Sequence, residues 1–357
     1  QAGRDGFVAK VAPDGNLSWY LLLNDSADQN GADDRVSALA ATTNGLLYAA
    51  GFIGRPDLDD TGCDASLTSI SSASGGINWT ARLGDANKTN LFSAVAVDSN
   101  GYVYAVGTTT LTNLPNPVAG YSVNGTNYGA HLKGKTDACV VKFAPGNGAV
   151  VWSCYLGGTN DDAATACAVA ADGSVYVAGQ TRSAGWTTLS SRTPTPSNPD
   201  AFVVKLSASG AHVWSTFFGG SAADAVASLA KAPKSGTLVL GGTTASSDFV
   251  AATNRLNAYA GGTDGFVLAL TDTGTAFQTN WCRFFGGSTA DSVSALVVLT
   301  NGPIAVGGTT ASGAWLAETG SSTFGGAQDG FVSLLAADGT VAWSSYVGAA
   351  NDETLRA

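Results

Sequence analysis

The sequence lacks the segments and residues on which several protein classes depend. Charged residues make up only 12% of its 357 positions, and the net charge is −10. No apolar run approaches the ~20 residues of a membrane-spanning helix, so we expect no membrane insertion. Nucleic-acid binding needs a basic face, which an acidic chain with so few cations does not supply. We therefore expect no membrane insertion and no nucleic-acid partner.

Familiar catalytic motifs are also missing. The two histidines, His131 and His212, lie near no nucleophile motif, and the chain has no G-x-S-x-G, H-E-x-x-H or phosphate-binding loop. We expect no catalytic triad, no zinc site and no cofactor. A pair of glycosidase-like carboxylates stays open as a hypothesis, because such a pair is assembled from loops that are distant in sequence.

The chain contains no methionine and begins Gln1-Ala2-Gly3 without a leader-like segment, which we interpret as a processed chain or an internal fragment. Five N-x-Ser/Thr sequons cluster in its first part. Their clustering favours a glycosylated protein that is secreted, extracellular or on the cell surface. The sequons are at Asn16, Asn24, Asn78, Asn87 and Asn124.

What the sequence has in abundance is a repeat. The stretch from Asp200 to Thr244 contains four short β-type runs, and the chain holds six full or partial copies of it. Four strands per period are typical of propeller blades. Each copy opens with an aspartate: Asp5, Asp64, Asp137, Asp200, Asp264 and Asp329. Each also carries a tryptophan: Trp19, Trp79, Trp152, Trp214, Trp281 and Trp343.

We predict an all-β fold, a single β-propeller over residues 1–357 built from four-stranded antiparallel blades. Each blade takes its strands A and B from one hairpin and its strands C and D from the next. This phase gives five complete blades and a partial sixth. The complete blades lie near residues 35–83, 91–156, 163–218, 225–285 and 291–347. Residues 5–23 and 351–357 contribute to an incomplete or composite blade, whose open edge invites pairing with another chain.

The repeat pattern is D-[AG]-F-V-x-K, then W/Y-S-x-x-x-G-G, an acidic spacer, a strand of small residues and an N/D-G turn. It resembles the SBBP-type bacterial β-propeller repeat over nearly the whole chain. The copies beginning at Asp137 and Asp200 match best, whereas the copy at Asp64 departs most, since DASLTSI lacks the Phe and the Lys. The resemblance implies the fold and a secreted or surface location, but no activity.

The repeated aspartates and tryptophans are better explained by the blade than by chemistry. An Asp before a strand accepts backbone N–H bonds and fixes the turn, and a Trp packs between blades while its indole N–H finds a local acceptor. Acidic spacers end in Asp33-Asp34, Asn160-Asp161-Asp162 and Asn351-Asp352-Glu353. Such loops offer oxygen ligands, so calcium stays open beside the simpler interpretation of solvated turns.

Variable segments separate the second hairpin of each repeat from the next Asp, at residues 52–63, 108–136, 181–199, 243–263 and 309–328. Insertions of this kind gather on one face of a repeat protein and often form its binding surface. Four aromatic residues lie in them: Trp186, Phe249, Tyr259 and Trp315. They are candidate contacts for glycans or proteins, although burial under the loops is the favoured alternative.

Two of the five cysteines, Cys139 and Cys154, flank the turn at Gly146-Asn147. With a two-residue loop they stand directly opposite each other, within disulfide range. We predict a cross-strand disulfide, which fits an oxidising compartment. Cys167 is interpreted as a small buried residue, and Cys63 and Cys282 stay unassigned.

Three hypotheses for function follow. The first is a non-catalytic structural or adhesive module, not an enzyme, that self-associates or binds other surface proteins and forms an array or filament through its incomplete blade. The second is a carbohydrate-binding propeller that uses its loop aromatics. The third is a polysaccharide-active enzyme.

Overall fold

The computed structural model describes residues 4–23, 33–54, 62–85, 87–123, 126–189, 194–195, 197–233, 235–313, 315 and 324–356. Nearly all of the regular structure in these ranges is β-strand. Their single helix is a short 3₁₀ turn, η1 (Ala252–Asn254), and no helix of the described ranges has the length and apolarity needed to cross a membrane. The prediction of an all-β chain is confirmed.

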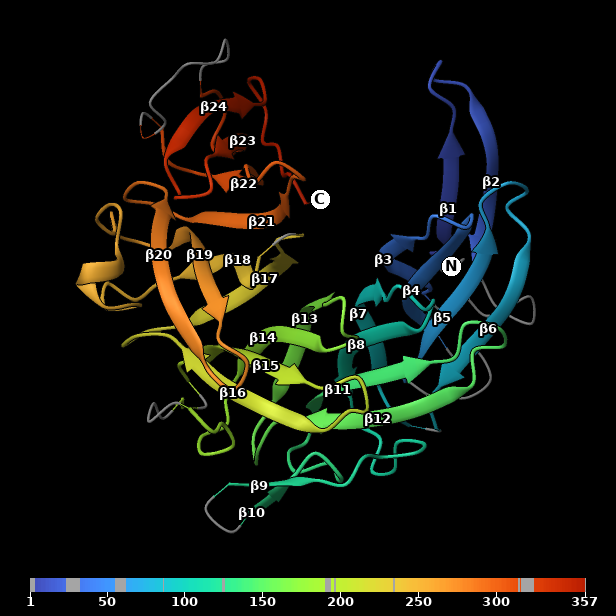
Figure 1. Ribbon diagram of the computed structural model, residues 1–357. Helices are drawn as coiled ribbons and strands as arrows, with labels where there is room; N and C mark the ends of the chain where they lie inside the picture. Colours follow the sequence, from blue (N-terminus) through green and yellow to red (C-terminus); the bar gives the residue numbers. More distant parts are fainter. Residues whose placement is uncertain are drawn as a thin grey trace. The chain divides into compact units, whose positions relative to one another are not determined.

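Five four-stranded antiparallel sheets follow one another along the chain (Figure 1). The first contains β3 (Arg35–Ala41), β4 (Leu46–Gly54), β5 (Cys63–Ser71) and β6 (Ile77–Leu83). The second contains β7 (Asn90–Val97), β8 (Val103–Thr109), β11 (Asp137–Phe143) and β12 (Val150–Leu156). The third contains β13 (Asp162–Val169), β14 (Val175–Thr181), β15 (Asp200–Leu206) and β16 (His212–Phe218). The fourth contains β17 (Asp224–Lys231), β18 (Thr237–Thr244), β19 (Asp264–Asp272) and β20 (Phe277–Phe285). The fifth contains β21 (Asp291–Val298), β22 (Ile304–Thr310), β23 (Asp329–Leu335) and β24 (Val341–Val347).

Two further sheets in the described part of the chain have two strands each. The first is the N-terminal hairpin of β1 (Gly6–Val11) and β2 (Leu17–Leu23). The second, β9 (Tyr121–Val123) with β10 (Thr126–Tyr128), lies inside a segment that we predicted to be loop. Each four-stranded sheet is ordered A-B-C-D, so the two hairpins of one blade come from consecutive copies of the sequence repeat.

The chain divides into two compact units, Gln1–Val177 with Leu206–His212, and Ala178–Lys205 with Val213–Ala357. In the first unit, one core cluster lies between the first two four-stranded sheets, around Tyr48, Phe92 and Phe143. In the second unit, a comparable cluster around Phe285 and Phe331 joins the last two sheets. Alternation along each strand sends successive side chains to opposite faces of the sheet, so a sheet can pack against a neighbour on either side.

Where strand A bulges, the residue that pairs with it on strand B is a glycine. The β7–β8 register shifts between Phe92 and Ala94, and the β3–β4 register shifts between Val36 and Ala38. Opposite the first bulge, a Cβ on Gly107 would lie 1.9 Å from the carbonyl oxygen of Leu91. Only glycine fits so close an approach of two backbones, which explains the small-residue composition of this strand.

The variable segments cover the outer edges of the sheets. Strand D is the last strand of each sheet, and three of these strands accept a bridge from the segment that precedes strand C. Pro117 bridges Ser153 on β12, Arg255 bridges Cys282 on β20, and the amide of Leu189 donates to the carbonyl of Ser215 on β16. Because exposed strand edges pair with other chains, these segments work as edge covers.

Candidate functional site

The repeated tryptophans join each hairpin to the next one along the chain. Trp152 on β12 donates its indole N–H to the carbonyl of Ala208 at 3.1 Å, and Trp281 on β20 donates to Ala337 at 3.1 Å. Both acceptors are in the turn between strands C and D of the following sheet. The other docked tryptophans make the same type of contact: Trp19 with Ser72, Trp79 with Pro145, and Trp214 with the carboxylate of Asp272.

In most of the receiving turns, a glycine with positive φ packs directly against the indole ring. Gly339 has φ +83°, and a Cβ on it would lie 2.7 Å from the Trp281 ring. Gly210, with φ +83°, lies in the same way against Trp152. Positive φ makes glycine the favoured residue for the turn, and the absent side chain leaves room for the ring.

The lysine of the repeat motif reaches the same turns. Lys142 donates to the Ala208 carbonyl at 3.0 Å, and Lys205 pairs with the Asp272 carboxylate at 2.6 Å. We did not predict this role, although the fixed spacing of Lys from the opening Asp is a signal of it in the sequence. Leu334 occupies the position in the last copy, so Trp343 has no lysine beside it.

Trp343 on β24 is the exception among the six tryptophans. It is 40% exposed, whereas Trp281 is 7% exposed. Among the described residues, the Trp343 indole N–H has no hydrogen-bond acceptor, and no C–D turn packs against the ring. The complementary feature is Gly15, in the turn between β1 and β2. It has φ +84°, and an added Cβ would meet no atom within 4 Å. Gly274 in the β19–β20 turn has equally open space, but Asp272 just before that turn accepts the Trp214 indole.

The outer face of the β1–β2 hairpin carries a second set of exceptions. Phe7, Val11 and Leu22 are 66%, 60% and 48% exposed. In the last copy the same repeat positions hold Phe331, Leu335 and Tyr346, which are at most 2% exposed. The corresponding positions in the Asp137, Asp200 and Asp264 copies are also buried: Cys139, Phe143, Tyr155, Phe202, Leu206, Phe217, Phe266, Leu270 and Phe284. An alignment of the repeat copies does not reveal this difference, because it contains no information on which positions are buried.

The opening aspartates organise the start of strand C. The carboxylate of Asp137 accepts N–H bonds from Lys133 and Gly134, and that of Asp264 accepts one from Ala260. Asp329 accepts from Gly325, whereas Asp5 is exposed. Asp200 is buried and Asp64 is half-buried.

A second carboxylate at the start of the next strand A lies beside the opening one. Asp224 accepts from Ser246 at 2.9 Å, from Thr244 and from the amide of Gly220. Burial raises the pKa of Asp224 and of Asp264 to about 6 and that of Asp137 to about 7, with nearby carboxylates adding to the effect. Similar carboxylates recur from junction to junction, with Asp162 and Asp291 at the positions equivalent to Asp224.

Loop aromatics are turned toward the cores. Trp186 is fully buried, donates to the Thr181 hydroxyl and packs edge-on against Phe202. Trp315 is half-buried, donates to Thr310 and packs against Phe331. Phe249 is buried, and Tyr259 is half-buried with its hydroxyl on the Gly262 carbonyl. Such rings offer little surface to a glycan.

The predicted disulfide is wrong. Cys139 stands opposite Tyr155 and Cys154 opposite Val140, so the two thiols lie on opposite faces of the sheet. The register departs from the predicted one because the pairing shifts at Lys142 and Phe143, next to a six-residue turn. All five cysteines are free, and burial raises the pKa of the Cys139 and Cys154 thiols to about 12.

Three sequon asparagines, Asn16, Asn78 and Asn87, are exposed. The side-chain amide of Asn16 donates to Asp14 and that of Asn78 to the Ser69 hydroxyl. Asn24 and Asn124 lie outside the described residues.

The acidic spacers bind backbone amides and hydroxyls of the chain itself. Asp33 accepts from the Arg4 amide, Asp161 from the Thr136 hydroxyl and Asp352 from the Ala327 amide. Among the described residues, no group of three or more His, Cys, Asp and Glu side chains is arranged to hold a metal. His212 stacks on Tyr121 and is half-buried, while His131 is exposed.

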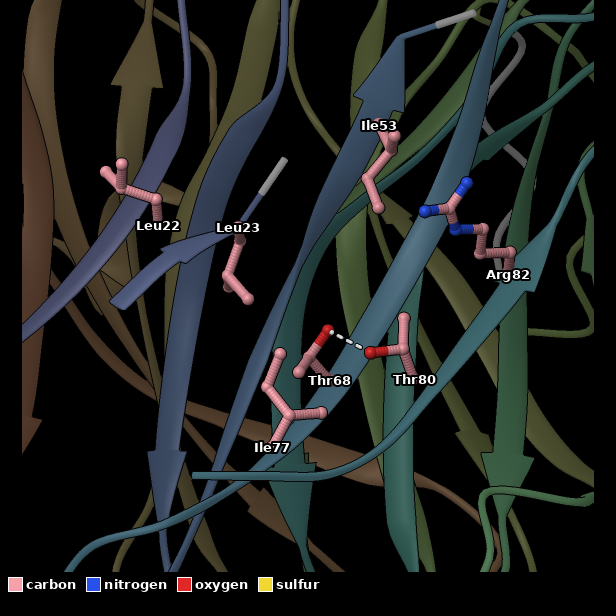
Figure 2. Close-up of a pocket in the computed structure, with 7 residues that line it drawn as sticks. All are labelled: Leu22, Leu23, Ile53, Thr68, Ile77, Thr80 and Arg82. Atoms are coloured by element: carbon pink, nitrogen blue, oxygen red, sulfur yellow. Dashed lines mark hydrogen bonds between the residues drawn. The ribbon is translucent and has the colours of Figure 1, made fainter. Parts of the chain in front are cut away.

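A cavity of about 370 Å³ lies beside β2, lined by strands β4 to β6 (Figure 2). Leu23 and Ile53 form its apolar part, and Thr68 and Thr80 hydrogen-bond to each other at 3.1 Å. The space arises where Arg82 replaces an aromatic ring that other copies bury, such as Tyr155 or Tyr346. Its lining resembles an incompletely filled sheet interface more than an acid–base site.

No curated protein matches this chain at the sequence level. Among solved structures, BamB from Moraxella catarrhalis aligns at 14% identity, covering 97% of this chain and 84% of that one, with a TM-score of 0.40. A quinohemoprotein alcohol dehydrogenase from Comamonas testosteroni aligns at 11% identity over 97% of this chain, with a TM-score of 0.49. A mutant Trypanosoma rangeli sialidase aligns at 10% identity over 97% of this chain, with a TM-score of 0.39.

This chain spans 57% of the dehydrogenase and 52% of the sialidase. Similarities this distant say nothing about activity. The family comparison is more specific, because residues 78–115, from β6 through β8, match the model described as a beta-propeller repeat, SBBP. The resemblance carried by the sequence pattern is confirmed there: residues 78–115 are an SBBP beta-propeller repeat.

Proposed function

We propose that this chain is a non-catalytic structural β-propeller module that associates with copies of itself through the terminal faces of its repeat array. We define the N-terminal face as Phe7, Val11 and Leu22 on β1–β2, and the C-terminal face as Trp343 and Val347 on β24. The observation that carries the proposal is the exposure of these positions, which most other copies of the repeat bury.

An apolar face of this kind is costly in water. Each large side chain loses roughly 1.5–3 kcal/mol of transfer free energy while it stays exposed. Contiguous exposed apolar patches on soluble proteins mark interaction sites. Association of copies removes this exposure.

The absence of catalysis is part of the proposal and is supported by the use of the carboxylates. Asp137 and Asp224 each accept at least two hydrogen bonds from the chain itself. The rings of Trp186 and Phe249 pack into the cores. We therefore propose that the repeated carboxylates and the loop aromatics stabilise the fold and take no part in catalysis.

A secreted or cell-surface location is also part of the proposal. The exposed sequon asparagines Asn16, Asn78 and Asn87 and the SBBP repeat at residues 78–115 support it. The free thiols neither require nor oppose such a location. Secretion is tested directly by fractionating the source cells and probing intact cells with an antibody to the chain.

Sedimentation velocity over a concentration series tests the self-association. We expect the weight-average sedimentation coefficient to rise with concentration, and Phe7→Ser to shift that rise to higher concentration by removing an exposed ring. Leu189→Ser is the matched control, since Leu189 is exposed to a similar degree as Leu22 but lies outside both faces. A sedimentation coefficient that stays monomeric at every concentration contradicts the proposal.

A further inference from the structure

We infer that the turn Ala12–Asn16 of one copy docks on Trp343 of a second copy, with the indole N–H donating to the carbonyl of Pro13. This inference rests on the proposed function and names the contact that drives it. The contact is head-to-tail, because the C-terminal face of one copy receives the N-terminal hairpin of the next.

The contacts of the other tryptophans indicate how the Trp343 indole would donate its hydrogen bond. Five indoles in this chain donate to a C–D turn, at distances of 3.1 to 3.2 Å. In four of these contacts the acceptor is the carbonyl of the second turn residue. Trp343 lies at the equal position on its strand, and its exposed ring leaves the same approach open.

The acceptor half is specified by the turns. The amide of Gly15 donates to Ala12, and the amide of Ala12 donates to Asn16. The turn that receives Trp281 has the same pattern, with Gly339 donating to Ala336 and Ala336 donating to Thr340. Superposing the two patterns places Pro13 where Ala337 accepts the Trp281 indole.

The turns agree in a further hydrogen bond. Asp14 accepts the amide of Asn16, and Asp338 accepts the amide of Thr340. Gly15 and Gly339 share a φ of 83–84°. The β1–β2 turn thus has the shape of a receiving turn, and its glycine surface is open.

The apolar surroundings extend the contact. The N-terminal face lies where Phe331, Leu335 and Tyr346 lie in the last copy, and those residues pack against Trp281 and Phe285 in one core cluster. In the proposed contact, Trp343 and Val347 of one copy supply what Trp281 and Phe285 supply inside the chain. Since Leu334 replaces the lysine, Trp343 provides the only repeat-type donor at this contact.

Two variants test the two halves separately. Trp343→Ala removes the donor, and Gly15→Ala puts a methyl group where the ring would sit. Each is expected to raise the dissociation constant of self-association about 30-fold, the effect of losing one anchor residue worth about 2 kcal/mol. The control for backbone strain is Gly185→Ala, because Gly185 also has positive φ and open space but lies outside both faces.

A mixing experiment separates this contact from other modes of association. A Trp343→Ala copy keeps its turn, and a Gly15→Ala copy keeps its tryptophan, so an equimolar mixture has one intact contact. We expect heterodimers that do not extend further, as a head-to-tail contact requires, while each variant alone stays monomeric. Circular dichroism of both variants checks that they are folded.

The outcomes distinguish the inference from the proposal it rests on. If wild-type protein associates and both variants associate equally well, self-association stands and this contact is wrong. If the wild type is monomeric and Trp343→Ala only lowers its melting temperature, pairing between copies is wrong. A mixture that stays monomeric also overturns the inference.

Discussion

The junction between the last two sheets and the exposed face of β24 contain the same residue types in opposite environments. Trp281 lies on the turn at Ala336–Thr340 with its indole bonded to Ala337. Trp343, one repeat later, is exposed. Each hairpin supplies one docking tryptophan and one receiving turn. An array of such hairpins that does not close on itself leaves one of each unmatched, which is the arrangement that the proposed contact uses.

A second contrast concerns the starts of the strands. At the Asp200 and Asp224 junction both carboxylates are buried beside Gly219. After β24, Glu353 takes the position of Asp224: its amide donates to Gln328, as the Asp224 amide donates to Pro199. Glu353 is only half-buried, and its carboxylate accepts from Ala349. The tail thus repeats the hydrogen bond that opens strand A at Asp224.

The largest predicted effect comes from breaking one interior junction. Trp281→Ala should lower the free energy of unfolding by about 3–5 kcal/mol, the range for truncating a buried Trp. Trp343→Ala, at the same repeat position, should lower that of the isolated monomer by less than about 1 kcal/mol, because its ring is already exposed. Urea denaturation at low protein concentration measures both. Equal losses would show that exposure does not distinguish the two sites.

The fold was predictable because its signals are local and repeated. Turn glycines such as Gly45, Gly101 and Gly173 all have positive φ, as the Asn-Gly and Asp-Gly pairs indicate. The four-stranded antiparallel sheets follow from the two hairpins of each period. The sequence could not show in which copies the apolar positions are buried, since Phe7 and Phe331 are the same residue in the same motif.

The disulfide shows where local reasoning fails. Register depends on turn geometry, and a shift of one residue moves a side chain to the other face of the sheet. The turn Ala144–Ala149 pairs Phe143 with Val150, as the predicted register requires, but the bulge next to it skips Val151, so Cys139 meets Tyr155 instead of Cys154. The β9–β10 ribbon was missed for a related reason, because its strands are three residues long and carry no periodic pattern.

A glycine substitution sharpens the contrast between interior and end. A Cβ on Gly219 would lie 2.4 Å from Asp200 and 2.9 Å from Asp224, so Gly219→Ala should destabilise by about 1–3 kcal/mol through overpacking. A Cβ on Gly348, at the end, would lie 2.6 Å from the half-buried Glu353 carboxylate and 2.8 Å from buried Asp329, so Gly348→Ala should cost less because the longer Glu353 side chain has more freedom to shift than Asp224. Gly146→Ala meets no atom within 4 Å and serves as the control. Thermal unfolding of the three variants ranks them; a Gly348 effect as large as that of Gly219 would contradict this account.

The smallest predicted effect is a dependence on pH that belongs to the interior carboxylates. Burial raises the folded-state pKa of Asp137 to about 7 from an ordinary value of 3.8, so the folded state binds a proton that the unfolded state has lost. Stability should therefore rise as pH falls, by about 1 kcal/mol from about pH 8 to 6.5. Below 6.5 the effect is opposed, because burial lowers the pKa of His212 to about 4 and the unfolded state then takes up the proton.

The matched variant is Asp137→Asn, which cannot ionise. Because Lys133 and Gly134 donate to different oxygens of the carboxylate, the single amide oxygen of Asn keeps only one of these bonds, so the variant should be less stable than the wild type at every pH. Nature makes a similar exchange in this chain, where Asn90 starts β7 at the position that Asp162, Asp224 and Asp291 hold elsewhere. Urea midpoints across this pH window should be nearly flat for the variant, apart from the smaller contributions of Asp224 and Asp264, whose pKa values are raised to about 6. A slope as steep in the variant as in the wild type would assign the dependence to another group and leave the buried Asp137 charged throughout.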